Sequence, residues 1–226
     1  MKRIAPARAR ATGLQEPERL VFVVDDDQSV RTSLANLLST EDYAVETFAS
    51  AVEYLERAPA PGPACLVLDV RLPGLDGPAL QRQLTGEGRV EQIVFITGHA
   101  DIPMGISAMK RGAVDFLPKP FSDDELLAAV EQALARSAEH WKQRGEVAES
   151  RARLAKLTPR EFEVLRLVIT GLLNKEIAVE LDVAVRTIKT HRSRVMQKMG
   201  VDSVAELVRL AQRAGIAPAR HRPKGP

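Results

Sequence analysis

Five short apolar runs alternate with helix-like segments in the first part of the chain. Between the runs, apolar residues recur at helical spacing, as they do at Val30, Leu34 and Leu38. Strands that alternate with helices are typical of a parallel sheet with helices on both faces. The pattern predicts an α/β fold with a doubly wound, five-stranded parallel sheet, built on LVFVV (20–24), YAVETF (43–48), CLVLDV (65–70), QIVFIT (92–97) and VDFLP (114–118).

The later part of the chain has no strand-like run and is predicted to be a separate all-α domain. Its helical segments extend from LTPREFEVLRLVITG to SVAELVRLAQRAG. The stretch between the two parts, EHWKQRGEVAESRARLAK, is charged and is either a helical connector or a loose linker. We expect a disordered basic N-terminus at 1–19, an α/β domain at 20–136, a linker at 137–153, an all-α domain at 154–214 and a disordered tail at 215–226.

The charged residues are divided unevenly between these two parts. Residues 20–136 hold 9 Lys and Arg against 18 Asp and Glu, whereas residues 137–226 hold 18 against 10. A basic domain joined to an acidic one predicts that the second domain faces a polyanion. Cys65 is the single cysteine, and no apolar stretch has the length of a membrane span or the form of a signal-peptide core. We therefore expect a cytoplasmic protein that makes no membrane contact.

Polar residues follow four of the five apolar runs. They are Asp25 to Asp27, Asp69, Thr97 and Lys119. Because the chemistry of an open parallel sheet collects at the carboxyl ends of its strands, we expect these side chains to meet. Clustered carboxylates repel one another unless a hard cation joins them, and Mg²⁺ prefers oxygen ligands. Asp69, which stands apart, is then a candidate nucleophile toward a phosphoryl group, with Lys119 and Thr97 placed to contact the transferred oxygens.

The motifs around these positions resemble the four signatures of bacterial response-regulator receiver domains. They are VVDDD, LVLDVRLPGLDG, FITGHADIPM and GAVDFLPKPF, and they occur in the order and spacing of that family across residues 20–136. The resemblance implies a sheet in 2-1-3-4-5 order, phosphorylation of Asp69 by a sensor histidine kinase, and a homodimer on phosphorylation. It also implies that the receiver promotes its own phosphoryl transfer and dephosphorylation without being an enzyme in the usual sense.

The same resemblance implies roles for single residues. Thr97 and Phe116 match the switch pair, and Lys119 matches the lysine of the phosphorylation site. Asp27 lies one place beyond the acidic pair, so we leave it outside the metal site and expect it to cap the following helix. Mg²⁺ or Mn²⁺ would be held by Asp25, Asp26, Asp69 and the backbone carbonyl of Arg71.

The acidic stretch has other interpretations. DDDQS satisfies D-x-D-x-S, a pattern close to that of phosphatases in which the first aspartate, here Asp25, is the nucleophile. That alternative leaves Asp69 unexplained and requires a larger catalytic domain. The chain lacks G-x-x-x-x-G-K-[ST], so a P-loop nucleotidase is excluded. A receiver-like protein that no longer takes phosphate is disfavoured because every catalytic position is filled.

The basic half resembles the LuxR-type helix-turn-helix of the NarL/FixJ class across residues 154–214. NKEIAVEL is a short helix, DVA a turn, and VRTIKTHRSRVMQKM a second helix that has five Lys and Arg and no acid. At 100° per residue, Ile188, Val195 and Met199 share the face that packs inward. The residues predicted to contact DNA are Asn174, Lys175, Arg186, Thr187, Lys189, Thr190, His191, Ser193 and Lys198, with the second helix in the major groove.

Some residues of the basic half also have explanations that do not involve DNA. A basic helix is often only a solvated face, and His191 is nearly as well explained as a packed flank residue. Arg192 falls near the apolar side, so it is not expected to read bases. RNA is disfavoured because the segment carries no run of aromatics for stacking. The chain is thus interpreted as a transcription regulator that binds an inverted repeat in double-stranded DNA, with RNA polymerase as a further partner and activation favoured by family analogy.

Overall fold

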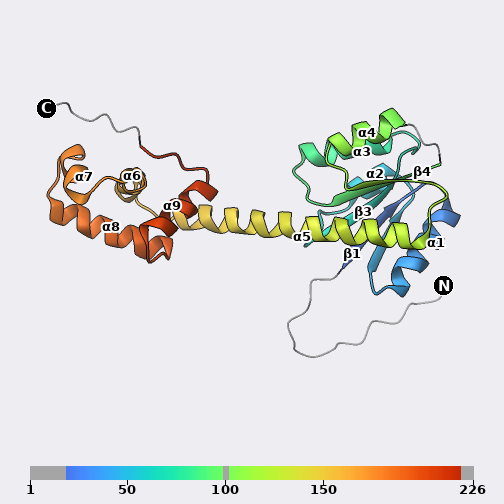
Figure 1. Cartoon of the computed structure of the whole chain (residues 1–226), viewed down its shortest axis with the longest axis horizontal. Coiled ribbons are helices and arrows are strands. Elements are labelled where there is room, and N and C mark those ends of the chain that lie inside the picture. The colour runs from blue at the N-terminus through green and yellow to red at the C-terminus, as the bar shows by residue number, and fades with distance from the viewer. Residues whose placement is uncertain (1–18, 99–101, 220–226) are drawn as a thin grey trace. The chain divides into compact units, whose positions relative to one another are not determined.

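The computed structural model describes residues 19–98 and 102–219, and its first part is a parallel α/β sheet (Figure 1). All strand pairs are parallel, and their order is β2-β1-β3-β4-β5. The predicted α/β class and the 2-1-3-4-5 order are therefore confirmed. The strands are β1 (Leu20–Val24), β2 (Ala44–Phe48), β3 (Ala64–Asp69), β4 (Gln92–Thr97) and β5 (Asp115–Pro118).

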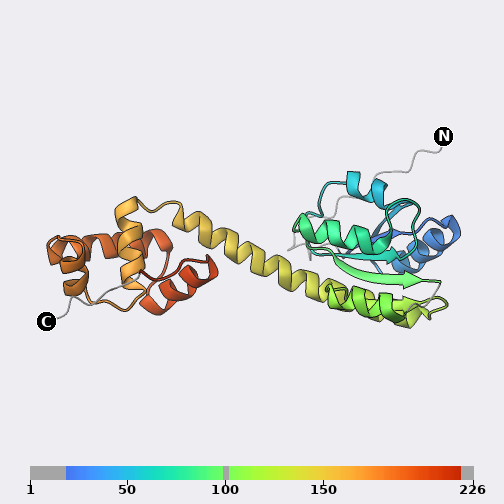
Figure 2. The same cartoon turned by 90° about the horizontal axis from the view of Figure 1, so that it is seen from above.

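Helices cover both faces of this sheet (Figures 1 and 2). Alternate strand residues point to opposite faces. Phe22 and Leu66 therefore pack with residues of α2, α3 and α4, whereas Val21 and Val67 pack with residues of α1 and α5. This two-sided burial explains why the strands are apolar runs rather than alternating ones. The helices are α1 (Gln28–Thr40), α2 (Ala51–Glu56), α3 (Gly77–Gly86), α4 (Ile102–Lys110) and α5 (Asp123–Leu154).

Helix α5 is 32 residues long and includes the whole stretch predicted as a linker. It begins after a capping arrangement in which the Ser122 hydroxyl accepts from the Glu125 amide and the Glu125 carboxylate accepts from the Ser122 amide. Of the two alternatives for residues 137–153, the helical connector is the one observed. By its contacts the chain divides into two compact units, 1–141 and 142–226, so the division falls within this helix.

The second unit is helical throughout its described residues. Its core contains the fully buried side chains of Leu165, Ile177, Ile188 and Leu207. Thr158 and Glu161 form a capping box at the start of α6, as the LTPRE segment allows. The helices are α6 (Pro159–Val168), α7 (Asn174–Glu180), α8 (Val185–Met199) and α9 (Val204–Arg213).

Two further predictions concern compartment and termini. Cys65 is fully buried in β3, and burial raises the pKa of its thiol, so it is a core residue rather than a nucleophile. Among the described helices, none combines the length and the apolar character that a membrane crossing needs. Of the segments predicted to be disordered, residues 1–18 and 220–226 lie outside the described residues. Residues 215–219 of the predicted tail are described, and they are ordered, because Ile216 and Ala219 pack against the core of the second unit.

Candidate functional site

Three strand ends meet at one lysine. The Nζ atom of Lys119, just past β5, donates to Asp25 Oδ2 at 2.7 Å and to Asp69 Oδ1 at 2.8 Å. Asp25 follows β1 and Asp69 ends β3, and they are only 1% and 6% exposed. The sheet order explains the convergence, because β1 and β4 flank β3 and β5 lies beside β4. The predicted meeting of Asp25, Asp69 and Lys119 is observed.

The second oxygen of the Asp25 carboxylate and that of the Asp69 carboxylate each accept a hydrogen bond from a backbone amide. Asp25 Oδ1 accepts from Asp27 N at 2.8 Å, and Asp69 Oδ2 accepts from Arg71 N at 2.7 Å. Burial raises the pKa of Asp69, while the Lys119 ammonium and the Arg71 amide oppose that shift. Burial alone would lower the pKa of Lys119, but the two carboxylates outweigh it and raise the pKa. Lys119 is therefore a cation at neutral pH, and it compensates the two buried acids.

The remaining residues implied by the receiver resemblance lie around this group. Thr97, at the end of β4, is 1% exposed, and its carbonyl accepts from the Lys119 amide at 2.7 Å. Phe116 is half-buried, with its ring centroid 6.4 Å from that of Phe95. Asp26 and Arg71 are exposed at the rim of the site.

Asp27 has the separate role that was predicted for it. It is the N-cap of α1, and its side chain accepts from the amides of Ser29 and Val30. A capping aspartate satisfies amides at the start of a helix that lack partners within it. The third member of the acidic run is thus explained by helix capping.

The chemistry of this oxygen-rich site suits a hard cation, but its present geometry is closed around Lys119. Mg²⁺ needs oxygen ligands at about 2.0–2.1 Å in an octahedron. Within the described part of the chain, no three His, Cys, Asp or Glu side chains are grouped so that they could hold a metal ion. The carboxylates of Asp25 and Asp69 fit in kind and in place, and Asp26 is exposed beside them. These three aspartates are the side chains that would hold the ion, and the site is closed by Lys119 as it stands.

Helix α8 presents a basic surface in the second unit. Ile188, Val195 and Met199 are each fully buried, as the helical spacing predicted. The opposite face is solvent-accessible, and among the predicted DNA contacts there the exposed side chains are those of Arg186, Thr187, Lys189, Thr190 and Ser193. Lys175, in the first turn of α7, is exposed as well.

Three of the residues predicted to contact DNA are partly buried, and two of them form contacts within the protein. Lys198 Nζ donates to Glu161 Oε2 at 2.6 Å, and this hydrogen bond, together with that from the Thr158 amide, lowers the pKa of Glu161 to about 2. Lys198 thus has an ion-pair partner within the protein, and its contact with DNA stays a prediction. Asn174 Oδ1 accepts from Arg192 at 3.0 Å, so both residues have a partner, while His191 is half-buried on the flank of α8.

Comparison with known proteins agrees with both halves of this geometry. The family model for the response regulator receiver domain matches residues 21–131, and the model for bacterial regulatory proteins of the luxR family matches residues 155–211. The transcriptional regulatory protein FixJ of Azorhizobium caulinodans is 44% identical over 204 residues, which are 90% of this chain and 97% of that protein. The chain belongs to the FixJ-type response regulators.

Other relatives of this response regulator give the same assignment. Nodulation protein W of Bradyrhizobium diazoefficiens is 47% identical over 198 residues, 88% of this chain and 87% of that protein. The solved structure of the response regulator StyR is 49% identical, has a TM-score of 0.77, and covers 86% of this chain and 98% of its own. The response regulator therefore has a receiver domain and a LuxR-type DNA-binding domain, and its family is one of transcriptional regulators.

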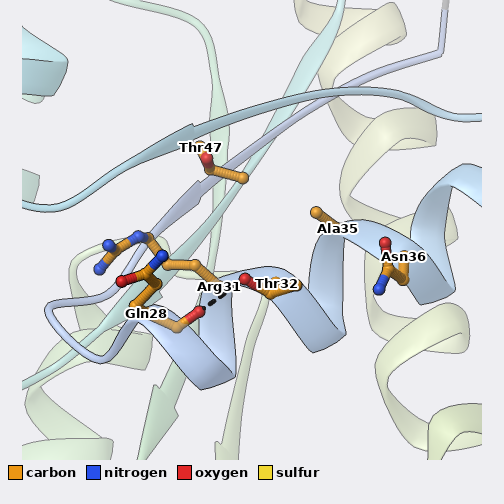
Figure 3. Close-up of a pocket in the computed structure, with 6 residues that line it drawn as sticks. All are labelled: Gln28, Arg31, Thr32, Ala35, Asn36 and Thr47. Carbon is orange, nitrogen blue, oxygen red and sulfur yellow. Dashed lines mark hydrogen bonds between the residues drawn. The ribbon is translucent and has the colours of Figure 1, made fainter. Parts of the chain in front are cut away.

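Sequence reasoning missed the role of Arg31 in the response regulator. Its Nη1 donates to the Asp25 carbonyl at 2.6 Å and so ties α1 to the end of β1. The side chain also lines a hollow of about 270 Å³, which Figure 3 shows between α1 and Thr47 of β2, together with Gln28, Thr32, Ala35 and Asn36. The sequence could not predict the contact between Arg31 and the Asp25 carbonyl, because this contact depends on how α1 packs against the sheet.

A second hollow adjoins the candidate site of the response regulator. It has a volume of about 300 Å³ and lies between the first half of α1 and the segment that follows β5. Its lining is mainly apolar and includes Val30, Leu34 and Phe121, with Lys119 at its side. The sequence does not reveal this hollow, because its two walls are separated by about ninety positions and are brought together only by the fold.

Proposed function

We propose that this response regulator accepts a phosphoryl group on Asp69 from a sensor histidine kinase, and that the phosphoryl group controls dimerisation and sequence-specific DNA binding. The observation that carries the proposal is the Asp69 carboxylate, which is held at the carboxyl end of the sheet by Lys119 and the Arg71 amide. An Asp69 oxygen would bond to phosphorus as the bond to the donor group breaks. The Lys119 ammonium, 2.8 Å from Oδ1, would then contact the transferred oxygens.

Burial favours Asp69 over Asp25 as the nucleophile. The Asp69 side chain is 9% exposed, whereas that of Asp25 is 1% exposed, and both contact Lys119. An attacking carboxylate must reach a donor that approaches from solvent, so the more accessible acid is the better nucleophile. The phosphatase alternative, which needs Asp25 to attack, is disfavoured on this ground.

The site would hold Mg²⁺ or Mn²⁺ through Asp25, Asp26, Asp69 and the carbonyl of Arg71. When bound, the cation would offset negative charge on the carboxylates and on the phosphoryl oxygens. The chain's own contribution is to keep Asp25 and Asp69 side by side, with their oxygens within 2.8 Å of one ammonium nitrogen. The apolar hollow beside Lys119 suits a donor protein that brings its phosphohistidine close to Asp69.

Labelling by a small phosphodonor tests this assignment. We expect Asp69 to be labelled in the presence of Mg²⁺, and labelling to fall to background in excess chelator. Asp26→Asn should slow labelling without unfolding the protein, because Asp26 is exposed and is outside the core. Asp27→Asn is the matched control, since asparagine also caps helices. Mass-spectrometric detection of phosphate on Asp25, or equal labelling in chelator, would contradict the assignment.

The phosphoryl group would act through Thr97 and Phe116. The Thr97 hydroxyl would donate to a phosphoryl oxygen, and Phe116 would move into the space that Thr97 leaves. Phe116 already packs closely on α4, where a Cβ added to Gly105 would lie 3.3 Å from its ring. Ile106 and Met109 of the same helix are 51% and 42% exposed, which supports the surface around α4 and β5 as the dimer contact. The two states would differ in these contacts, as a switch requires.

Dimerisation would give the DNA-binding domain its specificity. One recognition helix contacts only a few base pairs, so two copies of α8 would read half-sites about one helical turn apart. The target would be an inverted repeat, and the protein would act in the cytoplasm as an activator in contact with RNA polymerase. The exposed basic face of α8 and its buried opposite face support its placement in the major groove.

Two lysine substitutions separate base contacts from phosphate contacts. Lys189→Ala should relax base preference at one position of each half-site, at a cost of about 1–3 kcal/mol. Lys175→Ala should weaken binding to all sequences alike and reduce the salt slope by about one unit. Both residues are exposed, so neither change should alter stability. Competition binding with single-base variants of the site, at several salt concentrations, measures both effects. Identical behaviour of the two variants would contradict the orientation of α8.

A further inference from the structure

The last turns of α5 belong to the DNA-binding unit. The unit begins at Lys142, twelve residues before α5 ends. Ser150 is 3% exposed, and Leu154 packs against the core that contains Ile188 and Val195 of α8. Because these residues are buried among other residues of the same unit, this end of the connector is a structural part of the DNA-binding domain.

Within this segment, Arg153 reaches the end of the recognition helix. Its Nη1 donates to the Met199 carbonyl at 2.8 Å, and its Nη2 pairs with Glu149 at 2.7 Å. Gly200 follows Met199 with a φ of +61°, and a Cβ built on it would lie 3.2 Å from Arg153 Nη1. Glycine therefore gives the guanidinium room to lie against the last residue of α8.

The contact satisfies a backbone group that the helix itself cannot satisfy. The last carbonyls of a helix lack amide partners and carry partial negative charge, so a cation there is stabilising. The amide of Gly200 donates to the Gln197 carbonyl, and that of Val201 donates to the Met196 carbonyl. The Met199 carbonyl accepts from Arg153 instead. Helix α7 ends in the same way, because Arg160 of α6 donates to the Leu181 carbonyl at 2.9 Å.

We propose that Arg153 is a positioning residue for DNA recognition, which fixes the C-terminal end of α8 to the connector helix. The proposal rests on the function proposed above, in which α8 enters the major groove. A recognition helix discriminates bases only if its side chains are held in register by rigid neighbours. Helical structure in α5 as far as residue 153 would then be a requirement for specific binding, and a change in the connector would alter DNA affinity directly.

Arg153→Ala, Arg153→Lys and Arg151→Ala in the full chain test this role. Arg151 lies two residues away on α5 and is exposed, so it is a control for the loss of one positive charge. The probes are a duplex that the wild-type protein selects from a random library and a random duplex of equal length. We expect Arg153→Ala to lower affinity for the selected duplex about tenfold, and for the random duplex less. Arg153→Lys should fall between wild type and Arg153→Ala, and the salt slope should not change.

Hydrogen exchange provides a readout that is independent of DNA. The amides of Gly200 and Val201 should exchange faster in Arg153→Ala than in wild type, while those in the core of α6 should not. If Arg153→Ala does not fold, Arg153→Lys carries the test through the same two amides and an affinity loss of about threefold. The proposal would be overturned if Arg153→Ala had the DNA affinity and amide exchange rates of the wild type, or if it lost no more affinity than Arg151→Ala. A salt slope lower by one unit would instead make Arg153 a phosphate contact, and failure of the wild type to select any duplex would refute the proposed function.

Discussion

Gly77→Ala is expected to destabilise the receiver domain by about 3 kcal/mol, at the upper end of the cost of overpacking a core. A Cβ at Gly77 would lie 2.5 Å from the Asp69 carbonyl oxygen and 3.0 Å from the Phe95 ring. The first of these atoms belongs to the backbone of the central strand and cannot give way. Helix α3 therefore begins close to Asp69 only because residue 77 has no side chain.

Urea unfolding of the full chain measures this effect, with Gly86→Ala as the control. Gly86 lies in the same helix, and nothing lies within 4 Å of a Cβ added there. Its replacement should be neutral or should raise stability by up to about 1 kcal/mol, because alanine favours a helix. If the two variants have equal stability, the close approach of α3 to Asp69 is wrong.

The α/β fold could be predicted because several patterns agree, whereas the strand order was implied by the resemblance to receiver domains. The strands are apolar runs that a two-sided sheet requires, and the turns between them carry capping residues such as Asp27, Ser50 and Asp76. The connector could not be predicted. Its sequence is charged and contains Gly145, so propensity alone does not decide between a helix and a loose chain. Contacts with the second unit, such as that of Leu154 with its core, contribute the missing stability.

The candidate site could be predicted where it depends on topology, and not where it depends on packing. Asp25, Asp69 and Lys119 follow parallel strands, so their convergence follows from the sheet order. The pairing of Lys198 with Glu161 joins residues 37 positions apart, and helical spacing places only the lysine. Helical spacing is enough to predict which face of α8 is exposed. The ion-pair partner of a residue beside that face, such as Lys198, depends on which helix packs next to it.

Asp69→Asn is expected to abolish the effect of a phosphodonor on DNA binding. If phosphorylation drives dimerisation, the second half-site contact becomes intramolecular, and the affinity should rise about a hundredfold without any change in base contacts. Asparagine has nearly the same shape as aspartate, but it is not a nucleophile, and its single oxygen can keep only one of the two contacts that Asp69 accepts from Lys119 and the Arg71 amide. The variant should therefore fold and bind DNA with the affinity of the unphosphorylated wild type.

Asp27→Asn is the matched control for this prediction. It removes one negative charge from the same end of the sheet, retains the cap of α1 and lies outside the proposed phosphorylation chemistry. It should keep the full gain on addition of the phosphodonor. Sedimentation of the same samples should show a shift toward dimer in wild type and in Asp27→Asn, but not in Asp69→Asn.

The most direct test is the affinity of the full chain for its selected duplex, measured by fluorescence anisotropy with and without a small phosphodonor and Mg²⁺. The proposed function predicts a large gain for the wild type and for Asp27→Asn, and no gain for Asp69→Asn. A gain that persists in Asp69→Asn, or a wild type that is phosphorylated on Asp69 without any change in affinity, would contradict the control of DNA binding by this aspartate.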